Sequence, residues 1–190
     1  MRLTLLLFWG ILLPAFRPVF AQLTPGSNVS LITVGPGQEV FTAFGHSALR
    51  ISDPDLGIDH IYNYGTFSFN EGFYWRFTKG ELNFWLSTVP FYQEFYSWTV
   101  LENRTVTQQV LNLSSRQKNE LFRYLETNAL PENRVYRYDY FYDNCSNRID
   151  TALKTVLGDS VIFSPESVAK KQNTTEASIR QLTHSYLLQE

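Results

Sequence analysis

A turn cluster in the first third of the chain constrains the fold more than any other feature. Residues 53–57 read Asp-Pro-Asp-Leu-Gly, a run of the residue types that end strands and form reverse turns. The cluster separates two β-type runs, residues 41–52 and 60–69, of which the second is rich in aromatic side chains. We therefore expect these two runs to pair as an antiparallel hairpin.

The rest of the chain combines further strand-like runs with helical ones. Strands are predicted at residues 30–34, 82–89 and 105–113, and helices at residues 72–78, 115–128, 145–157 and 176–188. The helix at 115–128 has the clearest start, because Ser114 and Gln117 have the spacing of a capping box. This order of elements predicts one α+β domain, in which an antiparallel sheet packs on helices.

The N-terminus has the pattern of a secretory signal peptide. Arg2 precedes a short apolar run, residues 3–13, and small residues at 19 and 21 suit cleavage before Gln22. We expect residues 1–21 to be removed, leaving a domain of residues 22–190 with its core at about 29–157 and a helical tail. The alternative is an uncleaved N-terminal anchor. No later apolar run is long enough to cross a bilayer, so we expect a periplasmic protein without a mature transmembrane helix.

The amino-acid composition limits the classes of ligand and site that the chain is expected to have. The formal net charge is −2, which is not the basic balance of a nucleic-acid-binding protein. The three histidines and the single cysteine lack the close spacing of a metal site, so we expect neither a metal nor another cofactor. A lone cysteine in an exported chain cannot form an internal disulfide, which marks its thiol as a candidate reactive group.

That cysteine, Cys145, stands at the predicted start of a helix, directly after Asp143 and Asn144, either of which can cap it. Backbone N–H groups and the helix dipole at this position favour thiolate over thiol, and thereby lower the pKa of the nucleophile. The same N–H groups could stabilise an oxyanion during acyl transfer. The alternative is an inert buried cysteine, since free cysteine is among the most buried residue types.

A base and an orienting group can be placed on the predicted hairpin. His46 starts the strand-like part of the first run and is the candidate base, although a structural histidine is the alternative. If Ser52 pairs with Asp59, His46 lies opposite Gly65, and Asn63 lies diagonally on the same face. Asn63 is therefore the first choice for the third catalytic residue. A register slip of one residue would select Tyr62 or Tyr64 instead.

Several motifs in this order resemble the Lnb N-terminal periplasmic domain family. The resemblance covers about residues 29–157 and rests on Gly-His-Ser-Ala-Leu-Arg-Ile at 45–51, Ile-Tyr-Asn-Tyr-Gly-Thr-Phe at 61–67, Trp-Arg-Phe-Thr-Lys-Gly-Glu-Leu at 75–82, and residues 138–148 around Tyr-Asp-Asn-Cys-Ser at 142–146. It implies a circularly permuted, papain-like (NlpC-type) fold, in which the histidine precedes the cysteine. It also implies a catalytic pair, which would fall on Cys145 and His46.

The family includes a lipoprotein N-acyltransferase, and the resemblance implies that activity here. The thiolate would take an acyl chain from a phospholipid and pass it to the N-terminal amine of a lipoprotein. That enzyme has a membrane-spanning C-terminal part for which this sequence has no candidate. The aromatic-rich residues 73–98 could form an acyl groove or a rim in peripheral contact with a membrane, and the alternative is that they are ordinary core. The alternatives are a papain-like cysteine hydrolase acting on peptidoglycan or an ester, and a non-catalytic envelope binding domain.

Four basic residues lie within or beside these motifs: Arg50, Arg76, Lys79 and Arg148. They could contact phosphate groups, or they could be ordinary surface or salt-bridged residues. Arg148 stands one helical turn after Cys145, where it could pair with Asp143.

Overall fold

The computed structural model describes residues 21–158 apart from residues 40, 70 and 80. The elements in chain order are β1 (Asn28–Val34), β2 (His46–Asp53), β3 (Ile58–Thr66), α1 (Phe73–Thr78), β4 (Asn83–Pro90), α2 (Phe91–Tyr96), the π-helical turn η1 (Ser97–Leu101), β5 (Val106–Val110), α3 (Ser115–Ala129), β6 (Val135–Arg137) and α4 (Cys145–Leu157). The predicted signal peptide, except its last residue, and the predicted helix at 176–188 lie outside the described residues.

Within the described part of the chain, the strands form one antiparallel sheet of six, in the order β5-β1-β2-β3-β4-β6. The predicted hairpin is confirmed: β2 pairs with β3, and Ser52 lies opposite Asp59. The same register continues through Leu49 and Tyr62 toward His46. The α+β architecture with helices on an antiparallel sheet is therefore as the sequence predicts.

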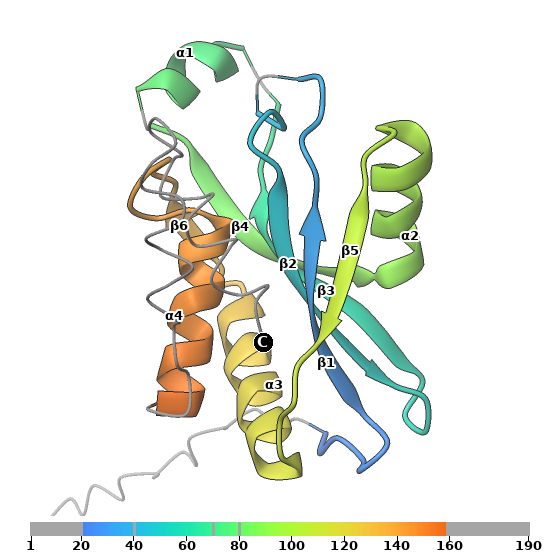
Figure 1. Cartoon of the computed structure of the whole chain (residues 1–190). Helices are drawn as coiled ribbons and strands as arrows, with labels where there is room; N and C mark the ends of the chain where they lie inside the picture. Colours follow the sequence, from blue (N-terminus) through green and yellow to red (C-terminus); the bar gives the residue numbers. More distant parts are fainter. Residues whose placement is uncertain (1–20, 40, 70, 80, 159–190) are drawn as a thin grey trace, which may run out of the picture.

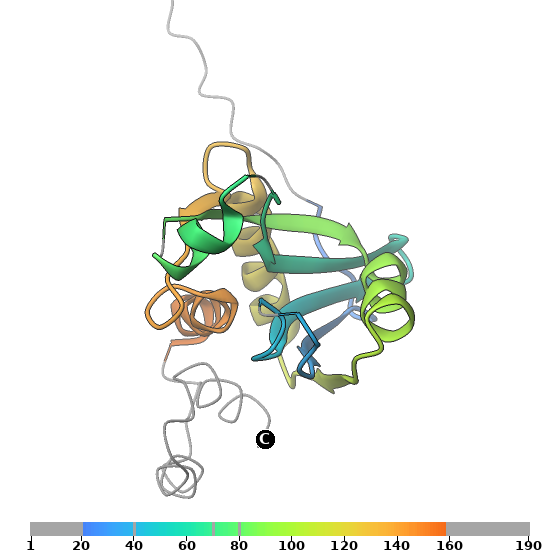
Figure 2. The same ribbon diagram turned by 90° about the horizontal axis from the view of Figure 1, so that it is seen from above.

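The two faces of the sheet have different cores. Side chains alternate along a strand with a period of two, so Leu49 and Ile51 face one way and Ala48 faces the other. Leu49 and Ile51 belong to the larger apolar cluster, which α3 and α4 cover (Figure 1). Ala48 belongs to a smaller cluster with Trp98 of η1. Figure 2 shows α3 and α4 on one side of the sheet and α2 on the other.

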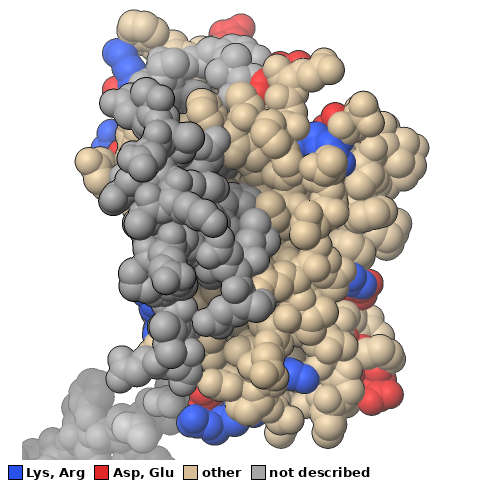
Figure 3. Space-filling model, viewed as in Figure 1, with Lys and Arg blue, Asp and Glu red and all other residues tan. Residues whose placement is uncertain are grey.

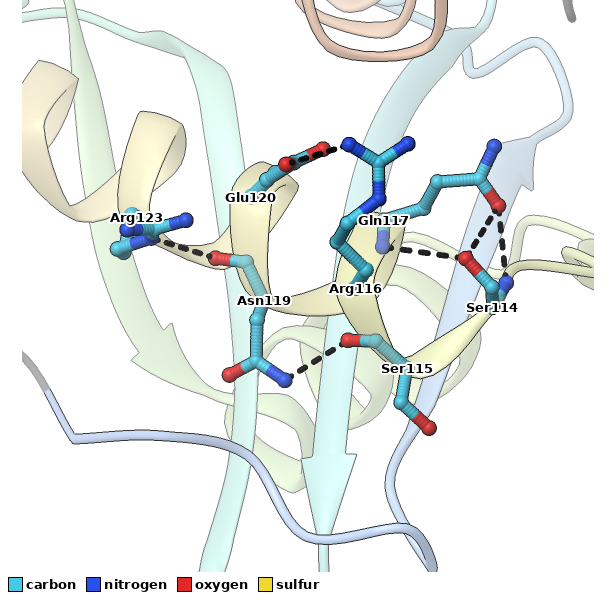
Figure 4. A network of polar contacts seen from close by, with 7 residues as sticks. All are labelled: Ser114, Ser115, Arg116, Gln117, Asn119, Glu120 and Arg123. Carbon is cyan, nitrogen blue, oxygen red and sulfur yellow. Dashed lines mark hydrogen bonds and ion pairs between the residues drawn. The ribbon is translucent and has the colours of Figure 1, made fainter.

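Helix α3 begins as its sequence predicts. The Ser114 side chain accepts a hydrogen bond from the Gln117 backbone N–H, and the Gln117 side chain accepts one from the Ser114 backbone N–H, which completes the capping box (Figure 4). Leu121 and Leu125 lie one turn apart on the same face and are fully buried against the sheet. The helix ends at Ala129, before Pro131.

Several boundaries differ from the predictions for local reasons. The run at 41–52 becomes a strand only from His46, because residues 42–45 form a turn that ends at Gly45 with φ of 76°. The strand predicted at 105–113 is shorter, Val106–Val110. Two segments were not predicted as such: α2 with η1, and the three-residue strand β6, which is too short to show a periodic pattern.

Candidate active site

Cys145 is the first residue of α4, as predicted, and its side chain is fully buried. The capping residue is Asn144, whose Oδ1 accepts hydrogen bonds from the backbone N–H groups of Ser146, at 2.9 Å, and Asn147, at 3.1 Å. Asn144 Nδ2 in turn donates to the carbonyl of Tyr140 at 2.9 Å. The cap therefore occupies the N–H groups of Ser146 and Asn147, two of the first-turn donors that the sequence offered for stabilising an oxyanion.

A set of contacts ties the start of α4 to the sheet. Arg148 donates two hydrogen bonds to the carboxylate of Asp143, the pairing that the sequence suggested. The Arg148 guanidinium also lies over the Tyr136 ring, with its carbon 4.2 Å from the ring centroid. Tyr136 donates its hydroxyl hydrogen to the Tyr64 carbonyl, and burial raises the pKa of Tyr136. These contacts hold the N-terminal end of α4, which carries Cys145, against the sheet.

His46 is the first residue of β2, also as predicted. Its ring lies 6.0 Å from the Trp98 ring, centroid to centroid. Gly65 lies directly beneath it: a Cβ built on Gly65 would stand 2.5 Å from His46 Cε1. The His46 Nε2 atom is shielded from solvent and has no hydrogen-bond partner among the described residues.

The described contacts join Cys145 and His46 through their chain neighbours. Ser47 Oγ lies 3.3 Å from Ser146 Oγ, which brings the first turn of α4 to the end of β2 that carries His46. By the alternation of β2, Ser47 leaves the strand toward α4 and His46 leaves it toward Trp98. The predicted thiol–imidazole hydrogen bond is not formed through Nε2 within the described residues. The catalytic roles of the two residues stay predictions.

Asn63 lies beside His46, where the predicted register puts it. A Cβ on Gly65 would be 3.1 Å from His46 Nδ1 and 3.2 Å from Asn63 Oδ1, so both side chains converge on this glycine. Asn63 Oδ1 accepts a hydrogen bond from the Gly65 backbone N–H at 2.7 Å, at a point where the pairing of β3 with β4 is irregular. Asn63 therefore braces the strand beneath His46, and no described hydrogen bond joins it to the imidazole ring.

Glu94 of α2 is a charged neighbour of His46 that the sequence analysis missed. Burial raises the pKa of this carboxyl, while the charge of His46 and a hydrogen bond from the Asn63 side chain act in the opposite direction. The missed signal was a single acidic residue within the aromatic run Phe91–Tyr96. Glu94 is thus a second candidate, beside Asn63, for a group that orients the imidazole.

A cavity of about 150 Å³ opens beside His46. Its lining includes the aromatic residues Phe67, Phe84 and Tyr138 and the polar residues Asn63, Glu102 and Arg104. This volume holds about one benzene-sized group, well short of a long acyl chain. The described cavity beside His46 is therefore short and partly polar.

Two further observations bound the site. The described residues contain no cluster of three or more His, Cys, Asp and Glu side chains that could hold a metal ion. Among the described helices, none is both long and apolar enough to cross a membrane.

With this geometry in view, comparison with known families is informative. The profile of the Lnb N-terminal periplasmic domain family matches residues 17–183. The chain belongs to this family. The motifs that suggested the resemblance lie on β2, on β3, from α1 to the turn before β4, and around the start of α4. Of these elements, β2 carries His46 and α4 carries Cys145. Searches among curated proteins and among solved structures gave no match.

Proposed function

We propose that this Lnb-family domain is a thiol acyltransferase, with Cys145 as the nucleophile and His46 as the base. We further propose that its fold is a circularly permuted papain-like one. The order of a histidine-bearing strand before a cysteine-bearing helix supports this reading. The single observation that carries the proposal is the position of Cys145, at the first residue of a capped helix that contacts the strand end bearing His46.

The proposed reaction has two transfers. In the first, His46 takes the proton of Cys145, and the thiolate attacks an ester carbonyl of a phospholipid. The C–O bond breaks, a thioester forms, and the lysophospholipid oxygen leaves with the proton from His46. In the second, the amine of a lipoprotein's N-terminal residue attacks the thioester, which gives an amide and returns the proton to the thiol. Neither transfer needs a cofactor.

Exposed aromatic side chains next to both residues support contact with a membrane surface. Phe44 stands two residues before His46 and is 42% exposed, whereas Phe141 and Tyr142, just before Cys145, are 50% and 79% exposed. The Phe44 and Tyr140 rings touch edge to face, with centroids 5.0 Å apart, so the two loops form one aromatic rim. Aromatic side chains of this kind favour the interface between lipid and water. We propose that this rim brings the site to the phospholipid.

A second candidate function is a papain-like cysteine hydrolase. The observation that favours it is the cavity itself, because a space of about 150 Å³ with polar lining residues suits a small polar group better than a long alkyl chain. A hydrolase of a peptidoglycan peptide or an ester would use the same acyl-enzyme, with water as the acceptor. A non-catalytic envelope binding domain is the third reading, and it predicts no acyl-enzyme at all.

Intact-mass spectrometry distinguishes these functions. The protein is incubated separately with phospholipid vesicles and with peptidoglycan fragments, and Cys145→Ala serves as the matched variant. Acyl transfer predicts one added acyl mass on the wild type with vesicles and none on Cys145→Ala. Cleavage of the peptidoglycan fragment with no lipid adduct would support the hydrolase instead. No adduct and no cleavage would support the binding domain.

A further inference from the structure

Arg104 is a buried cation whose hydrogen-bonding capacity is only partly used. Its side chain is 4% exposed, and it follows η1 in the segment that leads into β5. Its Nε donates to the Gly35 carbonyl at 2.8 Å, and its Nη1 donates to Glu102 Oε2 at 2.8 Å. Its Nη2 is shielded from solvent and has no hydrogen-bond partner among the described residues. A buried donor without a partner lowers the stability of the folded state, so we expect an acceptor to bind this atom.

Arg104 lines the cavity beside His46, and a second residue with a shielded nitrogen lines it too. This residue is His46 itself, whose Nε2 is likewise without a hydrogen-bond partner among the described residues. The two residues are linked through Trp98, whose carbonyl accepts the Arg104 backbone N–H at 2.8 Å and whose ring lies 6.0 Å from the His46 ring. With a hydrogen on His46 Nε2, two unused N–H donors line one small space. An oxyanion with several acceptor oxygens matches that arrangement.

Three of the four basic residues singled out in the sequence have partners away from this cavity. Arg50 donates from Nε and Nη2 to the two carboxylate oxygens of Asp59, at 2.7 and 2.9 Å. Arg148 is paired with Asp143. Lys79 Nζ lies over the Trp75 ring, 4.5 Å from its centroid. On the face shown in Figure 3, the visible Lys and Arg side chains are scattered rather than gathered into a patch. Arg104 is the arginine that lines the cavity beside His46.

We propose that this cavity binds the phosphodiester group of a phospholipid, with Arg104 Nη2 and His46 Nε2 as the hydrogen-bond donors. The choice of ligand rests on the proposed acyltransferase function. The charge of the site also favours a diester, because Glu102 is paired with the single positive charge of Arg104 and Glu94 lies near His46. A singly charged diester therefore fits better than the more highly charged inorganic phosphate.

Binding is measured by calorimetry on the Cys145→Ala protein, in which acyl transfer cannot occur. The probes are glycerophosphoethanolamine, dihexanoyl-phosphatidylethanolamine, dihexanoylglycerol and inorganic phosphate. We expect both phosphodiesters to bind and dihexanoylglycerol, which lacks the phosphate, to bind at least tenfold more weakly than the phospholipid. Binding of inorganic phosphate tighter than either diester would identify a free-phosphate site and overturn the proposal. So would the absence of binding by any phosphate compound, with water then filling the cavity.

Two substitutions with opposite expected effects on diester affinity test whether the ligand binds in this cavity. Arg104→Gln should weaken binding of the diester at least tenfold, while Arg116→Gln, which removes an exposed arginine of α3, should leave it unchanged. Glu102→Gln removes the competing carboxylate and should strengthen binding, most of all for inorganic phosphate. If Arg104→Gln fails to fold by circular dichroism, Glu102→Gln decides: unchanged or weaker binding refutes the proposal.

The phosphodiester site and the proposed acyltransferase function can fail independently of each other. Diester binding that depends on Arg104, with no acyl adduct on the wild type, would leave the site standing and remove the acyltransferase. An acyl adduct that forms equally fast in wild type and in folded Arg104→Gln would support the acyltransferase and remove the phosphodiester site.

Discussion

Substitution of Gly65 by alanine should displace His46, because the glycine lies against the imidazole ring. A Cβ at position 65 would stand 2.5 Å from His46 Cε1, whereas carbon atoms in contact are separated by about 3.5–4.0 Å. The ring must therefore move by roughly 1 Å. Gly65 is not among the described residues with positive φ, so the steric overlap dominates over backbone strain. We expect overpacking to lower the free energy of unfolding by about 1–3 kcal/mol.

Thermal unfolding measures the loss of stability in Gly65→Ala, and the NMR signals of His46 measure the displacement of its ring. For a chain of this size the loss corresponds to a Tm lower by roughly 2–12 °C. If His46 is the base, as we propose, a displacement of about 1 Å would also reduce the proposed acyl transfer by ~100-fold. The matched control is Gly26→Ala, since a Cβ there would have its nearest neighbour at an ordinary 3.6 Å. A Gly65→Ala protein with the Tm of Gly26→Ala and unshifted His46 signals would refute the packing argument.

Two further predictions concern the residues around the pair. Asn144→Ala removes the buried cap of α4 and should lower the free energy of unfolding by about 1–2 kcal/mol in chemical denaturation, whereas Asn144→Asp, which keeps an acceptor oxygen, should lose less; equal losses would contradict the capping role. The pKa of Glu94 is raised from its ordinary 4.5 in the folded state, so the folded protein binds the proton more tightly and stability should fall as the pH rises from about 4.5 through the raised value. Glu94→Gln should therefore be more stable than wild type at pH 8 and similar to it near pH 4, and a Tm difference independent of pH would contradict this.

The elements with strong local signals could be predicted from the sequence. The hairpin of β2 and β3 follows from one turn cluster and its flanking β-type runs. Its register, in which Ser52 pairs with Asp59, is one of the two that the sequence left open. The helix from Cys145 to Leu157 follows from a capping asparagine at one end and Gly158 at the other. These features depend on a few neighbouring residues, which is why the positions of Cys145 and His46 in their elements were predicted correctly.

The rest depends on contacts that the sequence does not display. Helix α2 begins directly after Pro90 with a run of aromatic residues, and its described residues include none that is fully buried, so no apolar stripe marked it. Glu94 comes near His46 only because that helix packs against β3 and β4. Likewise, Arg104 lines the cavity because the Gly35 carbonyl, 69 residues away, holds its Nε. Residue type and spacing alone did not distinguish Arg104 from the other arginines.

The most direct test of the account is the titration of the Cys145 thiol. Cys145 is the only cysteine in the chain, so the thiolate absorbance near 240 nm reports on it alone, with Cys145→Ala as the baseline. If Cys145 and His46 form the proposed pair, the thiol at this helix N-terminus should ionise well below ~8.5, the pKa of an isolated cysteine. His46→Asn should raise the midpoint. A wild-type midpoint at or above ~8.5 that is unchanged in a folded His46→Asn protein would contradict the nucleophile pair, and Cys145 would then be an inert buried cysteine.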